Sequence, residues 1–411
     1  MSVFLLSALA LGSLLVGIPV MWFTAQVLAG LKPTNKDRRL AIGTQPPNVA
    51  VLIPAHNESF HLIPTLDSLK PLQGDTCRIL VVADNCTDDT AEQARAQGVE
   101  VIERTDATKR GKGYALDFGL AQLTRSGAPD VVIVLDADCI PEPGAISRLA
   151  RHAVLTGRPV QSLYLMDDAP DGLNGQIAQF AWRVKNWTRP RGLKRMGLGC
   201  QLTGTGMAFP WACIEKVSFA TGHLVEDMQL GLALTEAGHA PVFDEHARVF
   251  SQFAPTPQAQ DSQRTRWEHG HLSLILNTGL PVALRGLKTG QRQLLALGLD
   301  VCIPPLALLV LAASGLVLIS SVLIPCIDVS AFLKGQAPKT HYLLLLVNWA
   351  WLGLLTLSVV MAWRSVGREV LQARALWSVP RYVLNKVPMY LRYLTKKQSE
   401  WVRSSRDSKE S

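Results

Sequence analysis

Two carboxylates stand directly after an unbroken apolar run in the segment VVIVLDADCIPEPG, where Asp136 and Asp138 follow residues 131–135. Two carboxylates separated by one small residue can share a divalent cation, whose open positions then accept phosphate oxygens. Charges at the end of a buried strand are costly, and a cation would offset that cost. The alternative is a turn that ends the strand, with Pro141 and Pro143 behind it. The segment taken alone favours neither interpretation.

Two other polar segments suit a nucleotide. Asp84 and Asn85 end another apolar run, in VVADNCTDDT, where the acid could accept a hydrogen bond from a nucleobase imide. An Asx turn before the next helix explains the same residues. Lys109, Arg110 and Lys112 surround two glycines in KRGKGYAL, and cations on a flexible loop suit a diphosphate, with Lys112 as the donor-binding member. A solvated basic loop is the commoner meaning of such a string.

A third acidic pair, Glu226 and Asp227, lies near the start of a helical pattern at residues 224–234. An acid in this position beside a pocket can act as a general base. The alternative is ordinary helix N-terminal charge, worth a few tenths to about 1 kcal/mol. Cys139, beside the opening aspartates, has no histidine near it in the sequence, so we interpret it as a small apolar filler rather than a nucleophile.

The segment QRTRW places Gln263, Arg264, Arg266 and Trp267 in a polar stretch, residues 259–271. On a helix, positions 263, 266 and 267 share one face. An amide, a guanidinium and an indole on one face suit an anion and a stacked sugar ring. Arginine and tryptophan that anchor a helix at a membrane interface are the competing interpretation.

The elements that must position these residues alternate along the chain. Apolar β-branched runs predict strands at 48–54, 78–83, 99–103 and 131–135, and helical patterns lie at 62–69, 87–97 (with Thr87 as N-cap) and 113–123. The segment 202–210 indicates a turn that enters a strand. Alternating strands and helices predict a largely parallel sheet covered on both faces, whose ligands bind beyond the carboxyl ends of the strands. Asp84 and the pair Asp136 and Asp138 stand at such ends.

Three stretches are long enough to span a bilayer, at residues 3–31, 301–327 and 342–363. The first has no basic segment before it and continues far past a possible cleavage site, so we expect a retained helix rather than a signal peptide. Basic residues follow the first and third spans. The positive-inside rule therefore predicts a protein of the inner (plasma) membrane. Its N-terminus would lie outside, and residues 32–294 and the tail would lie in the cytoplasm.

The net charge of +8 is concentrated at the C-terminus, where residues 364–411 hold eleven Lys or Arg and four Asp or Glu, a net +7. This pattern indicates an anionic membrane surface, and the mixture at 383–401 predicts an interfacial helix. No zinc-finger or RNA-binding pattern accompanies the charge, so no nucleic-acid partner is expected. The seven scattered cysteines indicate a reduced domain rather than a disulfide framework.

The order of these motifs resembles the membrane-bound family 2 glycosyltransferases, which include cellulose, chitin and hyaluronan synthases. QRTRW fits that family's Q-(Q/R)-x-R-W pattern in full, and PAHNES and ADNCTDDT are similar to its nucleotide-binding segments. The resemblance covers about residues 45–275 and the flanking helices. It implies an α/β GT-A fold, a Rossmann-like mixed sheet, in the cytoplasmic domain, and inverting transfer from a nucleotide-sugar.

The same resemblance implies a role for each motif. Asp84 would contact the base, expected to be uracil, and Asp136 and Asp138 would hold Mg²⁺ or Mn²⁺ on the diphosphate. Asp227 would be the catalytic base. The remaining donor-binding residues would be Gln263, Arg264 and Arg266, and the acceptor-binding residues Gly204, Thr205, Glu226 and Trp267.

Two departures bear on the product. The polymer synthases carry more spans, and the aromatic-cysteine acceptor motif of cellulose synthase is absent. We divide the chain into a first helix at 1–31, a catalytic domain at 32–294, two helices at 295–363 and a basic tail at 364–411. One hypothesis is synthesis of an extracellular polysaccharide or oligosaccharide, for which three spans would need self-association or an export partner to form a pore. A second is addition of one sugar to a lipid-linked acceptor, and a third is a non-catalytic scaffold that binds nucleotide-sugars.

Overall fold

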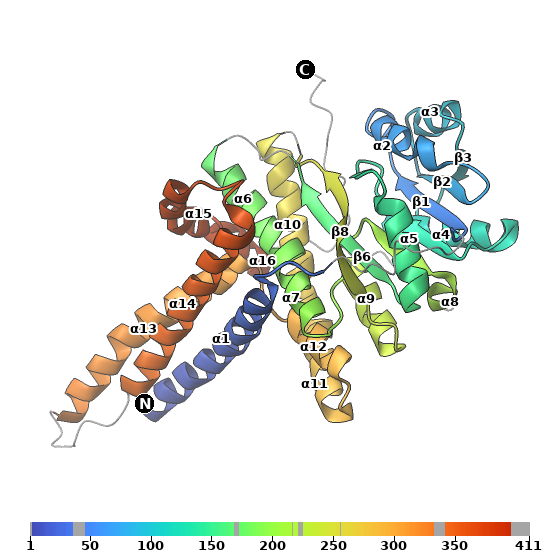
Figure 1. Cartoon of the computed structure of the whole chain (residues 1–411). Helices are drawn as coiled ribbons and strands as arrows, with labels where there is room; N and C mark the ends of the chain where they lie inside the picture. Colours follow the sequence, from blue (N-terminus) through green and yellow to red (C-terminus); the bar gives the residue numbers. More distant parts are fainter. Residues whose placement is uncertain are drawn as a thin grey trace.

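The computed structural model describes residues 2–35, 46–167, 172–215, 217–220, 225–254, 256–332 and 342–395. Figure 1 shows two parts, a head built around a β-sheet and an arm of three long helices that extends from it. The N-terminus lies at the far end of the arm. The functional residues predicted above therefore fall in the head, and the apolar stretches fall in the arm.

One mixed sheet of eight strands forms the centre of the described head, in the order β3-β2-β1-β4-β7-β6-β8-β5. Strands β3, β2, β1 and β4 run parallel, β7 is antiparallel to both β4 and β6, β6 is parallel to β8, and β5 is antiparallel to β8. The strands are β1 (Val49–Ala55), β2 (Cys77–Asp84), β3 (Glu100–Arg104), β4 (Val131–Val134), β5 (Ile140–Pro141), β6 (Val160–Met166), β7 (Met207–Pro210) and β8 (Val242–Ser251). The four predicted parallel strands are confirmed, and so is the turn that enters β7.

Helices cover both faces of the sheet, as its two-sided burial requires. Alternate residues of β1 belong to opposite clusters: Val51 packs with α2 (Leu62–Leu69), α3 (Thr90–Ala96) and α5 (Ala145–Thr156), and Leu52 packs on the other face. That other face carries α4 (Lys112–Ser126), α8 (Trp211–Ile214) and α9 (Glu226–Glu236).

The predicted start of α3 is wrong by three residues. Thr87 is not its N-cap, because the Thr87 N–H donates to Oδ1 of Asn57 at 2.7 Å and so holds the residue in the preceding loop. Asp88 accepts from the Thr90 N–H at 3.1 Å, which begins the helix at Thr90.

The arm consists of α1 (Ser2–Gly30), α13 (Leu306–Phe332) and α14 (Tyr342–Ala362), which pack on one another. Three segments are long and apolar enough to cross a membrane: Phe4–Gly30 in α1, Leu306–Ile327 in α13, and Tyr342–Gly367, which comprises α14 and the π-helical turn η5 (Trp363–Gly367). The expected second span began too early, at residue 301. Pro304 and Pro305 separate α12 (Arg292–Val301) from α13, because proline lacks the N–H that would continue the helix.

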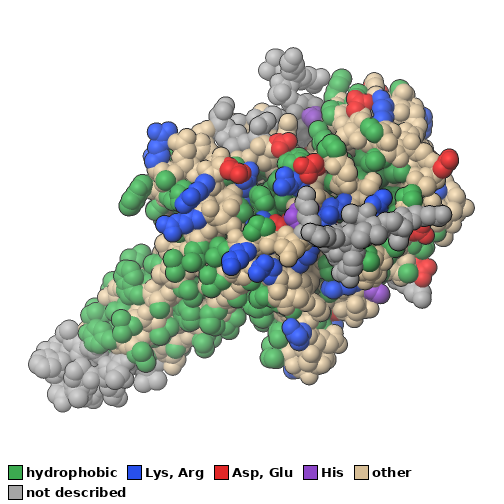
Figure 2. Space-filling model, in the orientation of Figure 1, with side chains coloured by type: hydrophobic (Ala, Val, Ile, Leu, Met, Phe, Trp, Pro, Cys, Tyr) green, Lys and Arg blue, Asp and Glu red, His purple; other side chains and the backbone are tan. Residues whose placement is uncertain are grey.

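Further helices of the chain are α6 (Leu173–Arg183), the π-helical turn η3 (Val184–Thr188), α7 (Arg189–Arg195), α10 (Pro257–Leu274), η4 (Ile275–Gly279) and α11 (Leu280–Thr289), of which α7 and η3 contact α1 of the arm. Two further short helices, α15 (Val379–Leu384) and α16 (Val387–Thr395), stand where one helix at 383–401 was expected, and residues beyond 395 lie outside the described ones. In Figure 2 Lys and Arg side chains gather where the hydrophobic arm meets the head.

A buried polar network fixes α1 to the head. Gln26 of α1 donates to Asp300 at 2.6 Å and accepts from the Arg189 Nε at 2.8 Å, and Arg189 also pairs with Asp300 at 2.7 Å. The backbones approach closely here, since a Cβ on Gly192 of α7 would collide with the Gln26 carbonyl. The arm and the head are thus joined by a buried polar network and by close backbone packing.

Candidate functional site

The largest concentration of predicted site residues lines a cavity at the carboxyl ends of β1, β2 and β4. Five of them face it, from four different segments of the chain: Asp84, Lys112, Asp136, Asp138 and Arg266. Its position agrees with the rule that open α/β sheets bind ligands beyond their strand ends.

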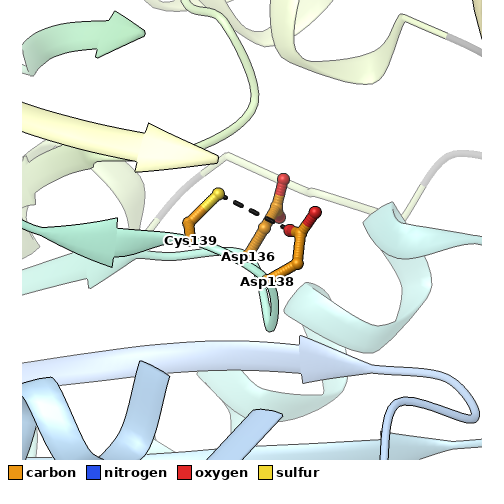
Figure 3. Close-up of side chains that lie close together, drawn as sticks. All are labelled: Asp136, Asp138 and Cys139. Atoms are coloured by element: carbon orange, nitrogen blue, oxygen red, sulfur yellow. Dashed lines mark hydrogen bonds between the residues drawn. The ribbon is translucent and has the colours of Figure 1, made fainter. Parts of the chain in front are cut away.

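Asp136 and Asp138 point in the same direction from the loop after β4, with Cys139 beside them (Figure 3). One ligand atom from each of the three lies within 4.8 Å of the others. Burial, and then the two neighbouring carboxylates, raise the pKa of the Cys139 thiol well above its usual value, and hard cations prefer oxygen to sulfur ligands. The remaining donor set is two carboxylates, which suits a hard cation such as Mg²⁺ or Mn²⁺. Ser251 donates to Asp138 at 3.1 Å and orients it.

Lys112 connects this pair to the rest of the site. Its ammonium lies 2.5 Å from Oδ1 of Asp136 and donates to the Gly204 carbonyl at 2.6 Å. Burial alone would lower the pKa of Lys112, but the carboxylates of Asp136, Glu226 and Asp227 outweigh it and raise that pKa. Lys112 is therefore a permanent cation at the centre of three acids.

Asp84 is buried at the end of β2, where Nη1 of Arg104 lies 2.6 Å from its Oδ1. The Asn85 amide donates to the same oxygen at 3.1 Å. Arg104 comes from the end of β3, which pairs in register with Asp84. The sequence did not point to Arg104, because only the parallel register brings the two side chains together.

Gln161 of β6 holds the segment 202–206, which contains the predicted acceptor residues Gly204 and Thr205. The Gln161 side chain accepts from the Thr203 N–H at 2.9 Å and donates to the Thr205 carbonyl at 3.0 Å. The Thr205 hydroxyl in turn accepts from the Asp136 N–H at 3.0 Å. Gly206 has a φ of +61°, and a Cβ there would collide with Ser162. This segment thus helps to set the position of the two cation-binding carboxylates, Asp136 and Asp138. Gln161 is a positioning residue to which the sequence did not point.

Glu226 and Asp227 occupy the first turn of α9, as predicted. A Cβ placed on Gly204 would stand 3.5 Å from both the Asp227 carboxylate and the Lys112 ammonium, so these two groups lie on the same side of the segment. Burial, and then the charge of Asp227, raise the pKa of Glu226 to about 7. Burial also raises the pKa of Asp227, against which the charges of Lys185 and Lys112 act. The two acids line a second cavity rather than the one described above, and acids whose pKa is raised beside a cavity are suited to proton transfer.

The QRTRW segment lies on α10, as expected, but its members face different surroundings. Arg266 lines the cavity, Gln263 is buried, and Arg264 is 3.6 Å from Asp261 in its own helix. Trp267 packs against Trp182 of α6, with ring centroids 5.1 Å apart. Of the segment, only Arg266 is among the cavity-lining residues, and the other three surround that position.

Comparison with known proteins agrees with this geometry. A family model described as "Glycosyltransferase like family 2" matches residues 46–270. The chain is 27% identical over 241 residues to the probable glycosyltransferase YdaM of Bacillus subtilis, a region that covers 56% of each protein, and 36% identical over 120 residues to glucosyl-3-phosphoglycerate synthase of Mycobacterium tuberculosis, 28% of this chain and 36% of that one. The aligned regions thus span about half or less of these relatives. Mannosyltransferase PcManGT from Pyrobaculum calidifontis, solved with GDP-Man and Mn²⁺, shares the fold with a TM-score of 0.52 and 14% identity, over 88% of this chain and 99% of that one.

Proposed function

Because this chain belongs to glycosyltransferase-like family 2, whose model covers more than half of it, we propose that it transfers a sugar from a nucleotide-sugar to a glycan acceptor with inversion. The expected family and the GT-A mixed sheet are confirmed. The narrower resemblance to cellulose, chitin and hyaluronan synthases stays a prediction. The observation that carries the proposal is the position of the Lys112 ammonium. It bridges Asp136, one of the two cation-binding carboxylates, and the Gly204 carbonyl, which lies beside Asp227.

The cavity suits the donor. Asp136 and Asp138 would hold Mg²⁺ or Mn²⁺, which when bound neutralises charge on the diphosphate. Lys112 and Arg266 add fixed positive charge on the same cavity wall, where it stabilises the leaving group. Asp84 would bind the base, expected to be uracil, with its carboxylate oriented by Arg104. Gln263 and Arg264 would support Arg266 from the same helix.

Asp227 is the proposed catalytic base. The attacking hydroxyl must lose its proton as it forms the new bond, and one carboxylate opposite the leaving group suffices. Lys185 and Lys112 favour the ionised form of Asp227, and the pKa of Glu226, at about 7, lets it share a proton with the acceptor. A single displacement of this kind inverts the anomeric centre.

The acceptor site would be formed by Gly204, Thr205, Glu226 and Trp267. Synthesis of a polysaccharide or oligosaccharide is the first candidate. A single transfer to a lipid-linked acceptor is the second, and one contact favours it: Glu268, next to Trp267, bonds Lys386 and Tyr390 beside the arm, so the acceptor side of α10 is tied to the membrane-proximal helices. The three apolar helices are long enough to cross a membrane, and the basic residues that follow the first and third spans predict that the head lies in the cytoplasm and the N-terminus outside.

Nucleoside diphosphate release by the full chain, reconstituted in vesicles, tests the reaction with Mg²⁺ or Mn²⁺: UDP is measured with a panel of UDP-sugars, and GDP with GDP-mannose. We expect release with one donor, loss of it with EDTA, and loss of it in Asp138→Asn and Asp227→Asn. Product length on a gel separates a polymer from a single addition. No release with any donor, or full activity in both variants as a scaffold would show, contradicts the proposal.

A further inference from the structure

Glu268 follows Arg266 and Trp267 on α10, and residues from the C-terminal end of the described chain hold its carboxylate. The carboxylate forms an ion pair with the Lys386 ammonium and accepts a hydrogen bond from the Tyr390 hydroxyl at 2.6 Å. The Glu268 side chain is only 11% exposed and that of Lys386 only 13%. Because both charges are largely removed from water, each needs the other as its counter-ion.

The next residue of α10 contacts the same region of the chain. His269 is buried, and its Nε2 lies 3.2 Å from the Met389 carbonyl. Its ring meets the edge of the Tyr393 ring, with the centroids 5.2 Å apart. Two consecutive residues of α10 therefore pack on α16 and on the residue before it. We call α15 and α16, with the two residues between them, the C-terminal helix pair.

The C-terminal helix pair is also packed into the arm. Tyr382 and Val383 of α15 belong to the same buried apolar cluster as Phe23 of α1 and Ala307 of α13. The Lys386 ammonium lies over the Tyr382 ring, 5.3 Å from its centroid. A continuous series of contacts thus runs from the arm, through the C-terminal helix pair, to Glu268 on α10.

Glu268 and Arg266 point to different sides of α10. Successive residues of an α-helix are about 100° apart, so residues two positions apart point in roughly opposite directions. Arg266 lines the donor cavity, and Glu268 therefore holds the helix from the side away from that cavity. The placement of α10 matters for the reaction, because a misplacement of about 1 Å in a catalytic site can cost on the order of 100-fold in rate.

We propose that Glu268 is a positioning residue for the donor site: held by Lys386 and Tyr390, it fixes α10 to the arm so that Arg266 stays in place for the leaving diphosphate. This inference rests on the proposed function and adds a residue that acts through Arg266. Among the described residues that line the donor cavity, none is Glu268, Lys386 or Tyr390, so the effect on the donor is indirect. Donor affinity would then depend on helices that follow the last span.

The test is a double-mutant cycle on the binding of UDP and of GDP, each with Mn²⁺, measured by calorimetry on the full chain in uncharged detergent. Glu268→Gln keeps the size of the side chain and removes its charge. We expect it to weaken nucleotide binding at least about fivefold, a part of the roughly 10- to 150-fold to which one charge-assisted hydrogen bond corresponds. In an Arg266→Met background the same change should alter the affinity less than about twofold, because the group that Glu268 positions is gone.

Three further variants separate positioning from a general loss of stability. Lys386→Arg keeps the cation and should bind nucleotide like the wild type. Tyr390→Phe removes one hydroxyl and should weaken binding in the same direction as Glu268→Gln, so it replaces that variant if the latter does not fold. Glu369→Gln is the matched control: Glu369 follows the last span and pairs with Arg183 of α6 at 2.8 Å, away from α10, and its loss should leave nucleotide affinity unchanged.

The outcomes are distinct. Equal nucleotide affinities of Glu268→Gln and the wild type, or an equal loss of affinity with and without Arg266, overturn the positioning role. A lower melting temperature with unchanged nucleotide affinity identifies a purely structural ion pair and overturns it as well. The wild type reports on the proposed function separately: binding of neither nucleotide with Mn²⁺ contradicts that function and this inference with it, whereas wild-type binding with an unchanged Glu268→Gln contradicts this inference alone.

Discussion

Replacement of Lys112 by methionine is the sharpest perturbation that the site offers. The variant keeps the length of the side chain and removes the hydrogen bond to Asp136 at 2.5 Å and the one to the Gly204 carbonyl at 2.6 Å. Both hydrogen bonds are charge-assisted because the donor is an ammonium, and each such bond contributes about 1.5–3 kcal/mol. Loss of about 3–6 kcal/mol in the transition state corresponds to a fall in kcat/KM of roughly 160- to 25,000-fold.

The same substitution removes the cation that lies among three acids, so the pKa of Glu226 should rise above its value of about 7. The activity of Lys112→Met should therefore recover in part as the pH rises toward 9. UDP release measured from pH 6 to 9, with the melting temperature of each variant, gives both quantities.

Lys109→Met is the matched control, because Lys109 lies exposed in the same loop and binds its neighbours through backbone atoms, the N–H to Asp106 and the carbonyl to Arg104. It should stay within about twofold of the wild type, since an exposed charge contributes little. Equal rates for Lys112→Met and Lys109→Met would refute the view that Lys112 joins the donor site to the base.

Three further changes test the geometry around the site. Gly206→Ala should lower the melting temperature and the activity together, because a Cβ there would collide with Ser162 and the residue has a φ of +61°. Gly74→Ala, at an open position, should change neither, and equal melting temperatures of the two variants would contradict the close packing at Gly206. Glu226→Gln should stabilise the fold more at pH 8 than at pH 5, because the folded pKa of about 7 lies above the ordinary 4.5 and ionisation therefore costs stability as the pH rises; a melting difference independent of pH would contradict this. Asp300→Ala should destabilise the junction by about 3–5 kcal/mol, since it leaves a buried guanidinium unpaired, and unchanged thermal unfolding in detergent would contradict that.

The first half of the head could be predicted from the sequence because its local patterns and its tertiary environment agree. Strands β1, β2 and β4 are almost entirely buried, and they read as unbroken apolar runs of strand length. Their carboxyl ends carry the polar residues, and parallel strands bring those ends to one edge. The sequence therefore predicts that Asp84, Asp136 and Asp138 lie at one edge of the sheet.

The second half of the head is harder to predict from the sequence, because its strands bury charged side chains. Strand β8, VFDEHARVFS, holds Asp244 and Glu245 in the interior, so its sequence does not resemble a core strand. The partners that make this possible come from elsewhere in the chain: Arg148 and His152 of α5 bind Asp244, and Arg191 of α7 binds Glu245. No local sequence pattern contains such pairings. Gln161, Trp182 and Lys185 could not be predicted for the same reason, because no local pattern singles them out.

The buried acids of this chain also show how structural and functional carboxylates differ. Asp244 is buried, yet its hydrogen bond to His152 and the cation of Arg148 lower its pKa to about 2, so its charge is fully matched. In the site, Asp136, Glu226 and Asp227 share the Lys112 ammonium, and the pKa of Glu226 and that of Asp227 are raised instead. Buried acids that are surrounded by too few cations destabilise a fold unless a cationic ligand or a proton compensates their charge. The sequence lists all of these carboxylates alike, and only the count of cations around each one separates the acids that hold the fold together from those that do chemistry.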